Sequence, residues 1–103
     1  MNEDRKLDWK EIKTLYPVGS KITGKVEHHA PFGIFLDIGH PVVKGLIQIT
    51  DFLDEGVMSP RMYPPIGHVI KAVVLAYTPD QRNQIWLSVK PSVLSQPELQ
   101  PRK

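Results

Sequence analysis

Two phenylalanine side chains, Phe32 and Phe35, lie three residues apart around a glycine in the segment HAPFGIFLDIG. From Gly33 to Ile38, branched apolar residues alternate with Phe35 and Asp37, which is the pattern of a strand with one buried face. Phe35 should therefore point into water beside a carboxylate, with Phe32 just before the strand. Exposed rings of this kind can stack on nucleic-acid bases. The alternative is that a loop or a terminal helix covers Phe35.

Histidine and lysine side chains near this pair could add contacts to a nucleic acid. His28 and His29 are adjacent, so in an extended backbone they point to opposite faces and cannot chelate one ion together. One of them, for which we take His28, can stand beside Phe32 and either contact the ligand or remain solvated. Lys21 and Lys25 fall on the outer face of the preceding strand, where they either meet phosphates or stay in water.

The charge balance limits how such a ligand could be held. The net charge is +2, and residues 19–90 contain seven Lys and Arg against six Asp and Glu. This excess is too small for a dense phosphate-binding stripe, so counterion release should be modest. Stacking must then supply more of the affinity.

Several other classes of function have no support in the chain. The absence of cysteine removes disulfides, thiolate catalysis and cysteine zinc sites, and the four histidines include no pair at helical ligand spacing. We therefore expect no metal and no cofactor. No second carboxylate accompanies Asp37, and the chain lacks a nucleophile elbow and a phosphate-binding glycine loop, so we expect no enzyme. No apolar run is long enough for a membrane span and the N-terminal stretch is charged, so we expect a cytoplasmic protein.

The elements that must position the rings begin with a short helix. Asp8 has the position of an N-cap and Pro17 stops the helix. A helix this short is marginal alone, so its apolar stripe should dock on the domain or on a partner. Trp86, which should point outward from the last strand, either receives this helix or extends the stacking surface. The stripe consists of Trp9, Ile12, Leu15 and Tyr16.

Five strands and a long connection are predicted after this helix. Residues 51–66 contain three prolines and should form a long connection with short helical turns around Phe52 to Glu55. Such an order favours an all-β fold, a closed five-stranded antiparallel barrel of the oligonucleotide/oligosaccharide-binding (OB) type. We expect an N-terminal extension at 1–18, the barrel at 19–90 and a flexible tail at 91–103. The strands are predicted at 21–27, 33–38, 44–50, 68–77 and 84–90.

Four blocks of the sequence resemble a known family. In order along the chain they are VGSKITGKVEHHAPFGIFLDIG, KGLIQIT, IGHVIKAVVL and QIWLSVK, the last ending in Leu87, Ser88 and Lys90 of an LSxK pattern. Together they resemble the S-one RNA-binding domain, the repeat of the largest small-subunit ribosomal protein. The resemblance covers residues 19–90 and implies an OB barrel that binds single-stranded RNA on the face of its second and third strands.

The resemblance also implies site residues by position. The exposed aromatics correspond to Phe32 and Phe35, the ligand-facing polar residue of the third strand to Gln48, and the acidic turn residue to Asp80. Many members of the family have histidine where Gln48 stands. A histidine can stack, whereas a glutamine can only hydrogen-bond, so affinity or base preference should differ.

A second departure from the family lies just before the last strand. Many members have a basic residue there, where this chain has Gln84. Arg82 lies two residues earlier and could substitute from the turn.

The expected function is a non-catalytic module that binds single-stranded RNA with low sequence specificity, in translation or RNA metabolism. We expect a monomer without a membrane partner. The alternative is a protein-interaction module that uses the same barrel to dock on a ribosome or an RNA-processing enzyme.

Overall fold

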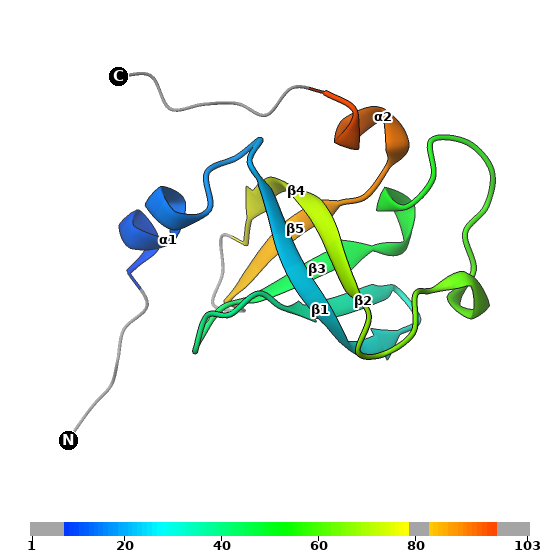
Figure 1. Ribbon diagram of the computed structural model, residues 1–103, viewed down its shortest axis with the longest axis horizontal. Helices are drawn as coiled ribbons and strands as arrows, with labels where there is room; N and C mark the ends of the chain where they lie inside the picture. Colours follow the sequence, from blue (N-terminus) through cyan, green and yellow to red (C-terminus); the bar gives the residue numbers. More distant parts are fainter. Residues whose placement is uncertain (1–7, 79–82, 97–103) are drawn as a thin grey trace.

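A closed barrel of five strands forms the centre of the computed structural model, which describes residues 8–78 and 83–96 (Figure 1). The neighbour order β1-β2-β3-β5-β4 closes because β4 pairs with β1. The predicted five-stranded barrel is therefore confirmed. The strands are β1 (Lys21–Ala30), β2 (Gly33–Asp37), β3 (Lys44–Gln48), β4 (Val69–Tyr77) and β5 (Gln84–Ser88).

One feature of the predicted barrel is wrong, because β3 and β5 run parallel while the other four pairs are antiparallel. The reason is geometric. Directions that alternate around a closed ring require an even number of strands, so a ring of five must contain at least one parallel pair.

The inward positions of all five strands fill the barrel with branched apolar side chains. At Gly45 an added Cβ would lie 2.7 Å from Cδ1 of Leu87, so the glycine leaves room for that side chain in the core. At Gly33 an added Cβ would lie 2.3 Å from the carbonyl oxygen of Ile47, which shows how closely β2 approaches β3 there. The fully buried strand residues include Val26, Ile34, Leu36, Ile47, Val74, Ile85 and Leu87.

The predicted N-terminal helix, α1 (Trp9–Leu15), closes one end of this barrel. As predicted, Asp8 caps it, its carboxylate accepting a hydrogen bond from the backbone N–H of Lys10 at 3.1 Å. Ile12 is 1% exposed and belongs to the core cluster, and Trp9 and Tyr16 pack against it, so the apolar stripe docks on the domain, except at Leu15, which is 51% exposed. Among the residues of this helix, Ile12 is the one that is fully buried.

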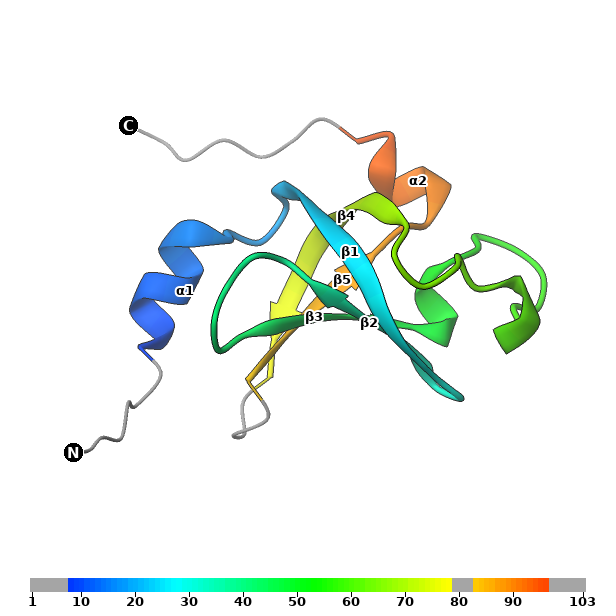
Figure 2. The ribbon, with the colours of Figure 1, turned by 60° about the horizontal axis from the view of Figure 1, so that its bottom comes forward.

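Helix α1 lies near the β2–β3 connection, away from the β1–β2 turn (Figure 2). Tyr16, which follows the helix, makes an edge contact with His40 of that connection, with ring centroids 6.3 Å apart. The Tyr77 hydroxyl donates to the backbone carbonyl of Tyr16 at 2.7 Å. The β1–β2 turn, where Phe32 stands, is thus left uncovered by this helix.

The connection between β3 and β4 closes the other end of the barrel. Its helical turns, η1 (Ile49–Asp51) and η2 (Pro60–Met62), lie on either side of the predicted position at Phe52 to Glu55. Phe52 and Tyr63 stack at 5.5 Å, both 7% exposed. The Tyr63 hydroxyl donates to the Ala30 carbonyl at 2.9 Å, and burial raises the pKa of this phenol.

The segment after β5 does not begin as the predicted flexible tail. Pro91–Leu94 form a short helix, α2, because proline suits a first helical position and Asp54 accepts a hydrogen bond from the backbone N–H of Ser92 at 2.9 Å. Residues 97–103 of the predicted tail lie outside the described residues, and the domain limits at 18 and 90 stay a prediction. Within 8–78 and 83–96, no helix has the length and apolar character to cross a membrane.

Candidate nucleic-acid interface

Three rings come together at the end of the β1–β2 hairpin. Phe32 is 54% exposed, and its ring meets that of Phe35 at a centroid distance of 5.9 Å with the planes at 89°. The ring of His28 also contacts that of Phe35, with centroids 5.8 Å apart and a tilt of 40°. These three side chains, the ring cluster, combine residues predicted from the sequence, and Phe35 keeps a partly exposed surface.

The backbone around the hairpin explains this arrangement. The β1–β2 pairing shifts register between Val26 and His28, which brings His28 directly opposite Phe35. Ala30 pairs with Gly33, so Phe32 stands in the tight turn between the two strands, and its carbonyl accepts a hydrogen bond from the N–H of Ile49 at 2.7 Å. The turn that carries Phe32 is therefore tied to the end of β3.

Gln48 lies beside the ring cluster. It is the register partner of Gly33, and it follows the inward Ile47, so its amide faces outward. Gly33 has no side chain, so no β2 side chain lies beside Gln48 at this register position, and the β3 backbone fills the space there. The amide can hydrogen-bond to a ligand that contacts Phe32.

The ring cluster continues across the barrel as one row of outward side chains. Strand partners share a face, so the row runs through Leu46 of β3 to Trp86 of β5. Leu46 is only 5% exposed but does not belong to the core cluster, which fits a side chain covered by large neighbours on the outer face. We call this set the ring row: His28, Phe35, Leu46, Trp86 and Ala76.

The alternation of residues in β3 signalled that Leu46 points outward, but it did not signal that Leu46 would be buried there. That burial depends on Phe35 and Trp86, which are distant in sequence. The continuous apolar row was therefore missed by sequence reasoning.

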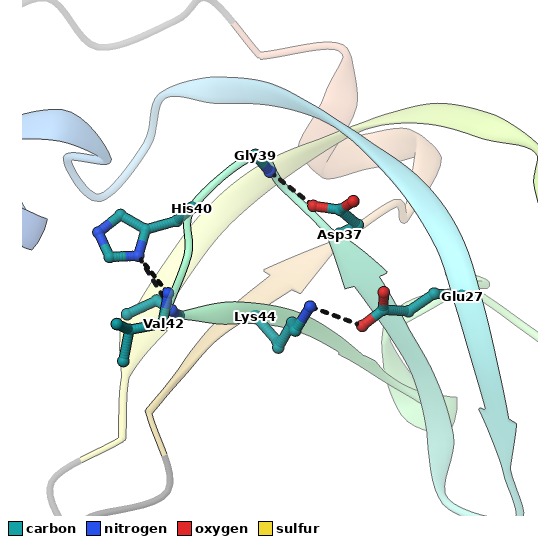
Figure 3. Close-up of polar contacts among 7 residues, drawn as sticks. Glu27, Asp37, Gly39, His40, Val42 and Lys44 are labelled. Atoms are coloured by element: carbon teal, nitrogen blue, oxygen red, sulfur yellow. Dashed lines mark hydrogen bonds and ion pairs between the residues drawn. The ribbon is translucent and has the colours of Figure 1, made fainter.

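A second outward row, next to the ring row on the same face of the sheet, carries charge. Lys25 is the register partner of Asp37, and Lys44 is that of Gln84. The ammonium group of Lys44 forms an ion pair with Glu27 at 3.1 Å (Figure 3). We call Lys25, Asp37, Lys44 and Gln84 the charged row. Its positive charges face or contact carboxylates, so little excess positive charge borders the rings.

Hydrogen bonds between residues close in sequence shape the β2–β3 connection, which lies at the end of the charged row (Figure 3). The Asp37 carboxylate accepts from the backbone N–H of Gly39 at 2.9 Å. Nδ1 of His40 accepts from the backbone N–H groups of Val42 and Val43, both at 3.0 Å. His40 is thus engaged in holding a turn and does not extend into the ring row.

Other candidate residues lie away from the ring cluster. Lys21 is seven residues before His28 on β1, roughly 20 Å along the strand at about 3.3 Å per residue. His29 packs its ring on Tyr63 at 5.2 Å and places Nε2 within 2.8 Å of the Pro64 carbonyl. Asp80 and Arg82 lie outside the described residues. Among the described residues, no group of three or more histidines and carboxylates is placed to hold a metal ion.

The sequence left open whether helix α1 docks on Trp86, and in the structure it docks elsewhere. Trp9 instead makes an edge contact with Tyr77, with centroids 5.9 Å apart. The register partner of Tyr77 is the inward Ile85, whereas Trp86 pairs with Ala76 on the outer face. The helix therefore docks at the barrel end and Trp86 stands on the wall.

Comparison with known proteins gives similarity over most of the chain. The chain is 33% identical over 83 residues, 81% of its length, to the small ribosomal subunit protein bS1 of Streptococcus pneumoniae. It is 33% identical over 82 residues to the 4-hydroxy-3-methylbut-2-enyl diphosphate reductase of Clostridium acetobutylicum. The chain spans only 20% and 12% of the lengths of these two relatives.

A solved structure shows the same fold. The solution structure of GSP13 from Bacillus subtilis matches with a TM-score of 0.65 and 26% identity, covering 85% of this chain and 65% of GSP13. No family model matches the chain.

Proposed function

Since the chain belongs to the S-one family of OB-fold domains, we propose that it binds single-stranded RNA by stacking bases on Phe32 and Phe35, without catalysis. The observation that carries the proposal is the ring pair itself, with Phe32 54% exposed and Phe35 at 5.9 Å from it. Apolar rings presented to water at a hairpin turn have no role in the core cluster. Base stacking on such rings contributes about 1–3 kcal/mol per base.

The perpendicular arrangement of the two rings determines how bases would lie. Planes at 89° cannot both stack on one base, so Phe32 and Phe35 each receive a different base. His28 borders the Phe35 site, and the Gln48 amide offers hydrogen bonds to a base edge or a 2′-hydroxyl. Because every base has a stacking face, binding tolerates many sequences.

A titration followed by NMR tests this assignment. Adding a short oligouridylate should shift the backbone amide signals of Phe32, Phe35 and Gln48, because these residues border the proposed base sites. Amides of helix α1, such as Thr14, serve as the internal control, since α1 lies away from the β1–β2 turn (Figure 2). Shifts confined to α1 and the β2–β3 connection would contradict the proposal.

The ion pair between Lys44 and Glu27 leads to a prediction about salt. We expect a shallow decline of RNA affinity with salt, because few free cations border the rings. Changing Glu27 to glutamine releases Lys44 for a phosphate and should raise affinity and steepen the log–log salt slope by about 1. Fluorescence anisotropy at several salt concentrations measures both. Glu55→Gln, an exposed carboxylate on the β3–β4 connection, is the matched control.

An unchanged slope in the Glu27→Gln protein would show that Lys44 does not reach phosphate. A steep slope in the unmodified chain, equal to six or more phosphate contacts, would contradict the stacking-dominated model.

A protein-docking module is the second candidate function, favoured by the near-neutral charged row. It would use the rings to fill a pocket on a ribosome or an RNA-processing enzyme. Ribosome association with no affinity for free RNA would favour it. The monomeric state, the cytoplasmic location and a role in translation or RNA metabolism remain predictions under either candidate.

A further inference from the structure

Trp86 stands at the far side of the ring row from His28. It pairs with Leu46 of β3, and Leu46 pairs with Phe35 of β2, so two strand spacings, about 9.5 Å, separate Phe35 and Trp86 across the sheet. The helix that could have covered the tryptophan instead contacts Tyr77 at the barrel end. Trp86 keeps a partly exposed surface.

The indole N–H of Trp86 is buried and has no hydrogen-bond partner in the part of the chain that the structure describes. Buried indole N–H groups normally find an acceptor. The ring orientation is thus held by packing alone, and a small rotation toward an acceptor would be favourable. An arriving ligand with exposed oxygen atoms can supply that acceptor.

We propose that Trp86 is an additional base-stacking position, reached by a single-stranded RNA that crosses β2, β3 and β5 from the phenylalanine pair. The inference rests on the proposed function and extends its site. The RNA would pass over the position of Leu46, which is 5% exposed beneath its large neighbours, so the surface between Phe35 and Trp86 consists of apolar side chains. A base then stacks on the indole ring of Trp86, and the indole N–H turns toward an oxygen atom of the RNA.

The surroundings of Trp86 favour RNA as the occupant. The ring row is continuous with the ring cluster, so an RNA strand held by Phe35 reaches Trp86 over apolar side chains. Gln84 of the charged row lies two residues before Trp86 on the same face, where its amide can meet phosphate and sugar oxygens of the RNA.

The two tryptophans of the chain allow a direct test. In a Trp9→Phe protein, Trp86 is the sole source of indole fluorescence and of the indole N–H signal in NMR spectra. An octauridylate should quench the fluorescence and shift the N–H signal. A diuridylate, which the phenylalanine pair can hold alone, should change neither signal by a comparable amount.

A second variant measures the contribution to affinity. Trp86→Leu should weaken octauridylate binding about 5-fold or more, the lower end of a lost base stack, and leave diuridylate binding unchanged. Val57→Ala, an apolar truncation at an 88% exposed position of the β3–β4 connection, is the matched control and should alter neither. If the leucine variant fails to fold, the Trp9→Phe titration still tests the inference with Trp86 intact.

The outcomes separate the two proposals. If octauridylate binds and shifts the Phe32 and Phe35 signals but leaves both Trp86 signals unmoved, this inference is overturned while the proposed function stands. Equal weakening of both oligonucleotides by Trp86→Leu would also overturn it, since the tryptophan would then act through the fold. Failure of the unmodified chain to bind either oligonucleotide would overturn both proposals.

Discussion

Replacing both Phe32 and Phe35 by alanine should remove most of the affinity for single-stranded RNA. Each ring is proposed to stack on its own base, because the two planes are perpendicular. A lost base stack costs about 1–3 kcal/mol, so each substitution alone should weaken binding about 5- to 150-fold. Fluorescence anisotropy with a labelled oligouridylate measures the dissociation constants of the single and double variants.

The control for this experiment is a second pair of exposed apolar side chains. Val57 and Met62 are 88% and 53% exposed on the β3–β4 connection, outside the ring row. Their double replacement by alanine should leave RNA affinity unchanged. Phe35 is partly buried, so thermal unfolding must show that its variants remain folded. A folded Phe32→Ala, Phe35→Ala protein that binds RNA as tightly as the unmodified chain would disprove the assignment of the site.

Replacing Ile12 by alanine should destabilise the barrel by about 2–5 kcal/mol. Ile12 is 1% exposed and is the residue of α1 that enters the core cluster, so its truncation leaves a cavity at the barrel end. Leu15→Ala is a matched control, because it shortens an aliphatic side chain on the same helix at a 51% exposed position. Its effect should stay within about 0.5 kcal/mol. Urea denaturation followed by circular dichroism measures the free energy of unfolding of both variants.

The same two variants separate stability from binding. Helix α1 lies away from the β1–β2 turn, so RNA affinity of the folded Ile12→Ala protein should equal that of the unmodified chain (Figure 1). Equal stability of the Ile12→Ala and Leu15→Ala proteins would show that the helix does not seal the barrel. Lost RNA affinity in a stable Ile12→Ala protein would place the ligand on the helix end.

Local patterns predicted the elements and part of the site. Period-two alternation placed the five strands and the outward direction of Phe35, because successive side chains of a strand point to opposite faces. The N-cap at Asp8 was predicted from residue type and position, since a cap is satisfied within one helical turn. The closeness of Phe32 and Phe35 was predicted because they lie only three positions apart in the sequence.

Contacts between distant residues decided the rest. The face of β1 on which each histidine lies depends on the register shift between Val26 and His28. As a result, His28 contacts Phe35 and His29 contacts Tyr63. The first residues of the expected tail form α2 because Asp54, far away in sequence, accepts from Ser92.

The sequence alone therefore determined which residues alternate, where α1 begins and that two rings lie close together where β2 begins, because these properties depend on neighbours in the chain. Only the tertiary structure decided that β3 and β5 run parallel and that Phe35, Leu46 and Trp86 form one row. The row exists because closing the sheet into a ring sets the register between strands that are distant in sequence, and no local pattern encodes that register.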